Sequence, residues 1–126
     1  MPQISLKISN NIDIHQINFE ETFVAIHDEL GKIQNLDVKT CHSGVIQEVY
    51  SHIGLGDKHA TKIYLEVLWL ESAERAVLKQ KLVRNLMSIL EKTLAPQIII
   101  QGLVCIPRVR IGNLGIINLD YHISGS

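Results

Sequence analysis

The second residue of the chain, Pro2, is the one whose type and position could most directly do chemistry. An initiator methionine is normally trimmed before a small residue, and trimming would leave a proline with a free secondary amine. An ordinary α-amino group titrates near ~8, so modest desolvation or nearby cations bring it into the range of a general base. If Met1 stays attached, the Pro2 nitrogen is an amide without a basic lone pair, and the proline simply starts an edge strand.

The histidines and cysteines, which could bind a metal or take part in catalysis, do not form a recognisable metal-binding or catalytic motif. The histidines are not arranged as a metal-binding motif and have no acidic cluster beside them, so hydrogen-bonded or surface histidines are the better interpretation. Cys41 and Cys105 lie far apart in apolar segments, where cysteine usually acts as a small buried hydrophobe. A Cys41–His42 catalytic pair is disfavoured because neighbours on a strand point to opposite faces. The histidines are His15, His27, His42, His52, His59 and His122.

Composition limits the classes of function. The chain has 126 residues, 46% of them apolar and 20% charged, with a net charge of −1. This is the balance of one globular domain, and it lacks the basic excess typical of nucleic-acid or membrane-surface binders. We expect neither a nucleic-acid nor a membrane partner. The chain shows no signal peptide and no apolar run long enough for a membrane span, so we expect a cytoplasmic protein.

The first half of the chain predicts a strand, a helix and a strand. Residues 2–9 alternate apolar and polar side chains, as in a half-buried strand. A helix follows from Asn18, which with Glu21 has the spacing of a capping box, to Gly31 as the residue just beyond its end. Residues 38–50 return to strand character, with Gly44 as a bulge or point of close approach. Residues 54–57 form a loop.

The second half predicts the same order again. Residues 59–70 form an interior strand with two largely apolar faces. A helix opens at Glu71 and Ser72 and ends at Pro96, and its apolar positions recur at helical spacing. A strand is predicted from Ile98 through Ile106, and the tail from 108 to 123 could add an edge strand. The apolar positions of this helix are Leu78, Leu82, Leu86, Ile89 and Leu90.

These elements indicate an α+β fold in which two tandem β-α-β units form one sheet with two helices on one face. We expect a single domain over residues 1–126, with halves at about 1–53 and 57–110 and a C-terminal tail at 111–126. The other sheet face, which the pattern predicts to be fairly apolar, then needs cover, and oligomerisation would provide it.

Pro2 at the head of a strand, the turn at residues 9–12, the doubled β-α-β layout and the chain length together resemble the tautomerase superfamily. The branch most similar is 5-carboxymethyl-2-hydroxymuconate isomerase. The resemblance covers most of the chain and is weakest after Pro107. It implies a homotrimer around a central barrel, an isomerase of aromatic compound catabolism, and catalysis without cofactor or metal. The proline nitrogen would move a proton within an unsaturated 2-hydroxy or 2-keto acid.

The same resemblance implies arginines that hold substrate carboxylates, for which the planar guanidinium fork is well suited. The arginine expected on the second strand falls at His42, which cannot replace a bidentate cation. The arginine expected at the start of the second helix falls at Glu74, or at Arg75 with a shift of one residue. Arg75 could equally be a solvated side chain paired with Glu71 or Glu74.

Two readings of function follow from these residues. In the first, the protein is a tautomerase with Pro2 as general base and acid, Arg75 on a carboxylate and His42 on the other end of the substrate. One missing arginine then predicts a monocarboxylate substrate. In the second, the protein is a catalytically inactive trimer that binds small acids or serves as a scaffold. Arg108 and Arg110 could reach a neighbouring subunit or be exposed charges of an edge strand.

Overall fold

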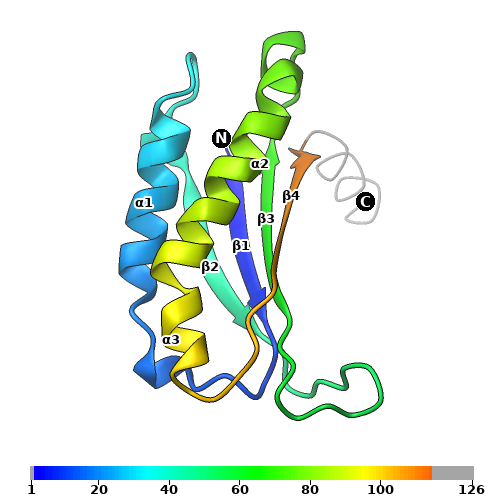
Figure 1. Cartoon of the computed structure of the whole chain (residues 1–126). Helices are drawn as coiled ribbons and strands as arrows, with labels where there is room; N and C mark the ends of the chain where they lie inside the picture. Colours follow the sequence, from blue (N-terminus) through cyan, green and yellow to red (C-terminus); the bar gives the residue numbers. More distant parts are fainter. Residues whose placement is uncertain (1, 115–126) are drawn as a thin grey trace, which may run out of the picture.

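The computed structural model describes residues 2–114 and shows an α+β fold in which helices cover one side of a four-stranded sheet (Figure 1). The strands are β1 (Gln3–Ile8), β2 (His42–Gln47), β3 (Ile63–Trp69) and β4 (Pro107–Asn113). The helices are α1 (Phe19–Gly31), α2 (Ala73–Thr93) and the short α3 (Ala95–Ile99), with 3₁₀ turns η1 (Ile14–Gln16) and η2 (Val38–Thr40). The predicted α+β class is confirmed.

The sheet has the order β2-β1-β3-β4, so β1 lies inside it rather than at its edge. β1 pairs in parallel with β2 and antiparallel with β3, and β3 pairs in parallel with β4. Each β-α-β half therefore has parallel strands joined across a helix, and the two halves meet at the antiparallel β1–β3 pair. This is the tandem organisation that the sequence predicts.

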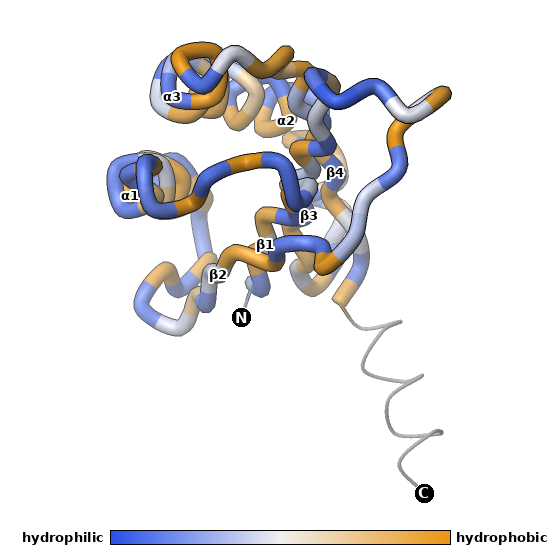
Figure 2. The backbone as a smooth tube through the Cα atoms, turned by 90° about the horizontal axis from the view of Figure 1, so that it is seen from below, coloured by the Kyte–Doolittle hydropathy of each residue, from blue (hydrophilic) through white to orange (hydrophobic). Residues whose placement is uncertain are grey.

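One side chain in two along β1 and β3 points into the core beneath the helices. On β3, Ile63, Leu65, Val67 and Trp69 are at most 2% exposed. Leu82, Leu86 and Leu90 on α2 and Ile26 and Leu30 on α1 pack against this sheet face. Figure 2 shows α1, α2 and α3 on the same side of the strands. Every second side chain of these strands and the apolar side of the helices thus pack together in one hydrophobic core.

The N-terminus of α1 is capped as predicted, but by a different partner on one side. The side chain of Asn18 accepts a hydrogen bond from the Glu21 N–H, as a capping box requires. The Asn18 N–H donates to the Gln97 Oε1, 2.7 Å away, and not to the Glu21 side chain. Gln97 lies on α3, so this hydrogen bond ties the start of α1 to α3. Gly31 is the last helical residue instead of the one beyond the end.

The strand predicted from Ile98 to Ile106 is wrong. Residues 95–99 form α3, with Pro96 in its first turn, where the missing N–H and fixed φ of proline favour a helix. Ile98 is fully buried, and it follows the fully buried Leu94 at helical spacing. The fourth strand begins at Pro107 and lies at the sheet edge, within the tail where an additional edge strand was considered.

The predicted strand 38–50 is shorter in the structure. Its first residues form η2, where the Asp37 side chain accepts from the Lys39 N–H, and only residues 42–47 pair with β1. Gly44 pairs with Ser5 in unbroken register, so the predicted bulge is absent from this strand. The loop predicted at 54–57 is confirmed, and Gly54 and Gly56 there have φ of 57° and 90°.

The sheet face away from the helices is much more polar than the sequence pattern suggested. Its centre is an ion cluster in which the Glu66 carboxylate lies 3.7 Å from Lys7 Nζ and 3.2 Å from an Arg110 nitrogen. Arg108 and Arg110 are exposed on the edge strand β4. Apolar side chains on this face are few, because the alternation of β1 and β4 places their polar residues here. The part of the tail after residue 114 lies outside the described residues.

Candidate functional site

One end of the sheet collects the residues that the sequence singles out. β1 and β2 begin at this end, and β3 runs in the opposite direction to finish there (Figure 1). α2 starts at the same end, directly after β3. The topology therefore brings the neighbourhoods of Pro2, His42 and Arg75 together, although the three residues are far apart in sequence.

Pro2 is buried and held by backbone contacts on the way into β1. Its carbonyl oxygen accepts a hydrogen bond from the His42 N–H, with 3.3 Å between the atoms. The next residue, Gln3, pairs with His42 on one side and with Leu68 on the other. Pro2 is thus fixed at the head of an interior strand. This is the rigid, partly desolvated position that a basic proline nitrogen would need.

His42 is near Pro2 in the backbone, but its side chain is exposed. It shares the open face of the sheet with Gln3 and Leu68, its partners in register. Its imidazole has no hydrogen-bond partner within residues 2–114. The ring therefore lies away from the helix-covered side, and contact with a substrate at Pro2 would have to occur around the end of the sheet.

Arg75 has well-defined contacts. Its guanidinium donates to the carbonyl oxygens of Leu70, at 2.8 Å, and Asn35, at 3.1 Å. The Arg75 Cζ also lies 5.7 Å from the centre of the Trp69 ring. A guanidinium has five N–H donors, so three remain for a ligand. Arg75 is therefore both a clamp between two loops and a cation at the candidate site.

These contacts favour Arg75 over Glu74 as the residue in the position of the arginine expected at the start of the second helix. Both residues lie in the first turn of α2, whose first N–H groups are capped by Ser72 through a 3.1 Å bond to the Arg75 N–H. Glu74 is exposed, whereas Arg75 is half-buried and turned back toward the sheet. The alternative in which Arg75 pairs with Glu71 or Glu74 is not seen among residues 2–114, where Glu71 pairs with Lys79 at 2.6 Å.

Trp69 and Asn35 contribute to this end of the molecule and were not identified as site residues from the sequence. Trp69 is fully buried, and its indole N–H has no acceptor within residues 2–114. Asn35 has a φ of 64°, a left-handed conformation that asparagine tolerates better than most residues. An asparagine in a short polar loop is a sequence feature that indicates such a left-handed residue, so Asn35 could have been identified in this way. The unpaired donor of Trp69 could not be foreseen.

A hollow of about 850 Å³ lies beside the start of α2. Its walls come from the loop after α1 and from residues 70–78, and they include Asn35, Glu74 and Arg75. Its volume is in the range of small-ligand sites. Pro2 does not line it, so the hollow flanks the proline position without containing it.

The remaining chemical groups near this end are a thiol and side chains with no metal-binding arrangement. Burial raises the pKa of the Cys41 thiol above its ordinary value, which disfavours the nucleophilic thiolate. Among residues 2–114, no group of three or more His, Cys, Asp or Glu side chains is placed to hold a metal ion. None of the helices in this range has the length and apolar character needed to cross a lipid bilayer.

Comparison with known proteins identifies the fold. No protein-family model and no curated protein sequence matches the chain. Among solved structures, a 5-carboxymethyl-2-hydroxymuconate isomerase from Deinococcus radiodurans R1 aligns with a TM-score of 0.72 and 11% identity, over 89% of this chain and 81% of that one. A second 5-carboxymethyl-2-hydroxymuconate delta-isomerase aligns with a TM-score of 0.64 and 15% identity, over 90% and 80% of the two chains.

A macrophage migration inhibitory factor-like protein from Entamoeba histolytica also aligns, with a TM-score of 0.57 and 11% identity over 89% of this chain and 87% of that one. These proteins are all members of the tautomerase superfamily. The chain therefore has the tautomerase fold, which is the fold that the sequence resemblance predicts.

Proposed function

We propose that this protein is a cofactor-free isomerase of the tautomerase type, with Pro2 as general base and acid once Met1 has been removed. The observation that supports the proposal is that Pro2, His42 and the start of α2 with Arg75 lie at the same end of the sheet, in a chain with the tautomerase fold. The fold alone does not imply activity, so the proposal depends on the site residues.

In the proposed reaction, the Pro2 nitrogen accepts a proton from one atom of a conjugated acid and returns it to a carbon further along. The double bond shifts, the composition of the substrate is unchanged, and no oxidant or reductant is required. Burial of Pro2 supports this role, since desolvation lowers the pKa of an amine into the range where it exchanges protons at neutral pH.

Arg75 would hold the carboxylate of the substrate with the donors that its loop contacts leave unused. His42 would orient the other end of the substrate by a single hydrogen bond. Arg75 is the one arginine among these three residues, which favours an unsaturated 2-hydroxy or 2-keto monocarboxylate over a dicarboxylate, because a neutral imidazole cannot replace a second bidentate partner. We further propose a homotrimer, in which the open sheet faces are covered by neighbouring copies, and a cytoplasmic location.

The second candidate is a trimer that binds a small acid without converting it. Two observations favour it: the exposed His42 stands where the resemblance predicts an arginine, and two donors of Arg75 already serve the loops. Under this proposal the hollow beside α2 would bind an acid, and Pro2 would only begin a strand.

The test is ketonisation of enol phenylpyruvate by untagged protein whose mass confirms that Met1 is absent, with the oligomeric state measured by sedimentation. The isomerase proposal predicts rapid turnover that is lost in Pro2→Ala and in protein that retains Met1. Gln80→Ala, at an exposed position of α2 away from both hollows, is the control and should retain activity. Turnover that persists in Pro2→Ala refutes the proposed base. Absence of turnover in the processed trimer favours the binding protein.

A further inference from the structure

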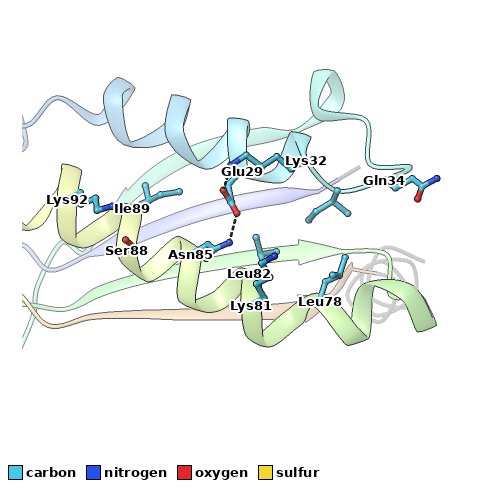
Figure 3. Close-up of a pocket in the computed structure, with 11 residues that line it drawn as sticks. Glu29, Lys32, Gln34, Leu78, Lys81, Leu82, Asn85, Ser88, Ile89 and Lys92 are labelled. Carbon is cyan, nitrogen blue, oxygen red and sulfur yellow. Dashed lines mark hydrogen bonds and ion pairs between the residues drawn. The ribbon is translucent and has the colours of Figure 1, made fainter.

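A second hollow, of about 720 Å³, lies in the helical layer between α1 and α2. Figure 3 shows its side chains along one side of α2 and at the end of α1. Lys81, Ser88 and Lys92 repeat along one face of α2, because residues seven and eleven positions apart return to the same side of a helix. About three turns, or roughly 16 Å, separate Lys81 from Lys92 along the axis.

The floor of this helix groove is apolar. Leu82 is only 4% exposed, and Ile33 and Ile89 are partly buried against the core. Leu78, at one end of the groove, is 37% exposed despite its size. An apolar strip that stays partly open to water gains free energy when an apolar ligand covers it.

The single acid in the groove is already neutralised. The Glu29 carboxylate accepts a hydrogen bond from Asn85, at 2.6 Å, and pairs with Lys32 Nζ, at 3.1 Å. Burial alone would raise the pKa of Glu29, but the Asn85 bond and the nearby lysines outweigh it and leave the pKa below its ordinary value. Glu29 is therefore ionised at neutral pH, and its charge is balanced by Lys32.

Lys81 helps to lower the Glu29 pKa, so part of its charge is balanced by that carboxylate. Lys92 has no ion-pair partner in the described part of the chain, and the groove thus combines an apolar floor with one unpaired cation, about three turns of α2 from Lys81. The complementary ligand has an apolar chain and a terminal anionic group. We propose that the helix groove binds a long-chain carboxylate, with the chain on the floor and the carboxylate at Lys92.

A small ligand fits these observations better than an acidic peptide helix. The volume of the groove lies within the range of 300–1,000 Å³ of ligand pockets, whereas a helix is about 10–12 Å across with its side chains. The Asn85–Glu29 bond also joins the two helices across the groove, which limits how deeply a second backbone could enter. The groove shares Ile33, Gln34 and Leu78 with the hollow beside the start of α2, Pro2 lines neither, and binding in the groove does not depend on the proposed isomerase activity.

The test titrates isotope-labelled protein with dodecanoate below its critical micelle concentration and follows backbone amide resonances by NMR. We expect saturable shifts confined to the groove, including Ser88 and Ile89, which do not line the hollow beside the start of α2. Lys92→Glu should weaken binding by about tenfold or more, since it removes the charge-assisted contact and adds a repulsion. Arg84→Glu makes the same charge change on the exposed side of α2 and should leave binding unchanged.

Acetate and dodecyltrimethylammonium serve as probes that lack the chain or the negative charge, and neither should bind with comparable affinity. The proposal is overturned by absence of saturable binding, by equal binding of the cationic probe, or by equal losses in Arg84→Glu. It is also overturned if an acidic amphipathic peptide shifts these resonances and dodecanoate does not. Thermal unfolding checks the fold of each variant, and Lys92→Gln replaces Lys92→Glu if that variant fails to fold.

Discussion

Removal of the Arg75 side chain should destabilise the protein measurably, even in the absence of any ligand. The guanidinium donates two hydrogen bonds to the carbonyls of Leu70 and Asn35 and lies over the Trp69 ring, 5.7 Å from its centre. Each bond contributes about 1 kcal/mol at a partly exposed site, and the cation–π contact adds about 0.5 kcal/mol. We therefore expect Arg75→Ala to lower the free energy of unfolding by about 2–3 kcal/mol, or about 6–9 °C in Tm.

Urea unfolding followed by circular dichroism measures this loss, with Arg84→Ala as the control for removing an exposed arginine from the same helix. The control should stay within about 0.5 kcal/mol of the parent protein. Arg75→Lys should restore less than half of the loss, because one ammonium group cannot span both carbonyls and also lie over the ring. If Arg75→Ala unfolds like the parent, the clamp does not exist and the whole guanidinium is available for a ligand.

Three further predictions concern the cap of α1, an acidic group and the thiols. Asn18→Ala should cost about 1 kcal/mol in urea unfolding, since the Glu21 N–H loses its acceptor; an unchanged stability would contradict the capping role. Glu29 has a lowered pKa, so its contribution to stability is present above pH 4.5 and is lost as the pH falls below that value; acid titration of Glu29→Gln should show a shallower loss than the parent. Burial raises the pKa of both Cys41 and Cys105, so alkylation by iodoacetamide should reach half its maximal rate above pH 9.0, and fast reaction at pH 7 would refute it.

Much of the fold could be predicted because its signals are local. The alternation of β1 and β3, the Asn18 cap and the helical spacing on α2 each lie within one element, and the structure confirms them. The strand predicted after Pro96 failed because a run of isoleucines fits a buried strand as well as a buried helix. Its buried positions, Leu94 and Ile98, contact a core that only the folded chain provides.

The sequence was enough to name the candidate site residues, but it could not predict the contacts that these residues make in the folded chain. The chemistry of a free proline amine and the scarcity of arginine near His42 are properties of the sequence. The clamp between Arg75 and the Asn35 carbonyl joins residues 40 positions apart, and no sequence period specifies it. Likewise, the Gln97 side chain replaces Glu21 at the start of α1 because α3 happens to lie there.

The sequence by itself determined the α+β class, the two β-α-β halves and the identity of the residues that could act as base and cation. Only the tertiary structure decided that β1 is an interior strand, that His42 lies on the open face while Pro2 is buried, and that the open face is polar. The physical reason is range: backbone period and capping act within a few residues, whereas burial, side-chain pairing and the walls of a hollow depend on which distant elements become neighbours.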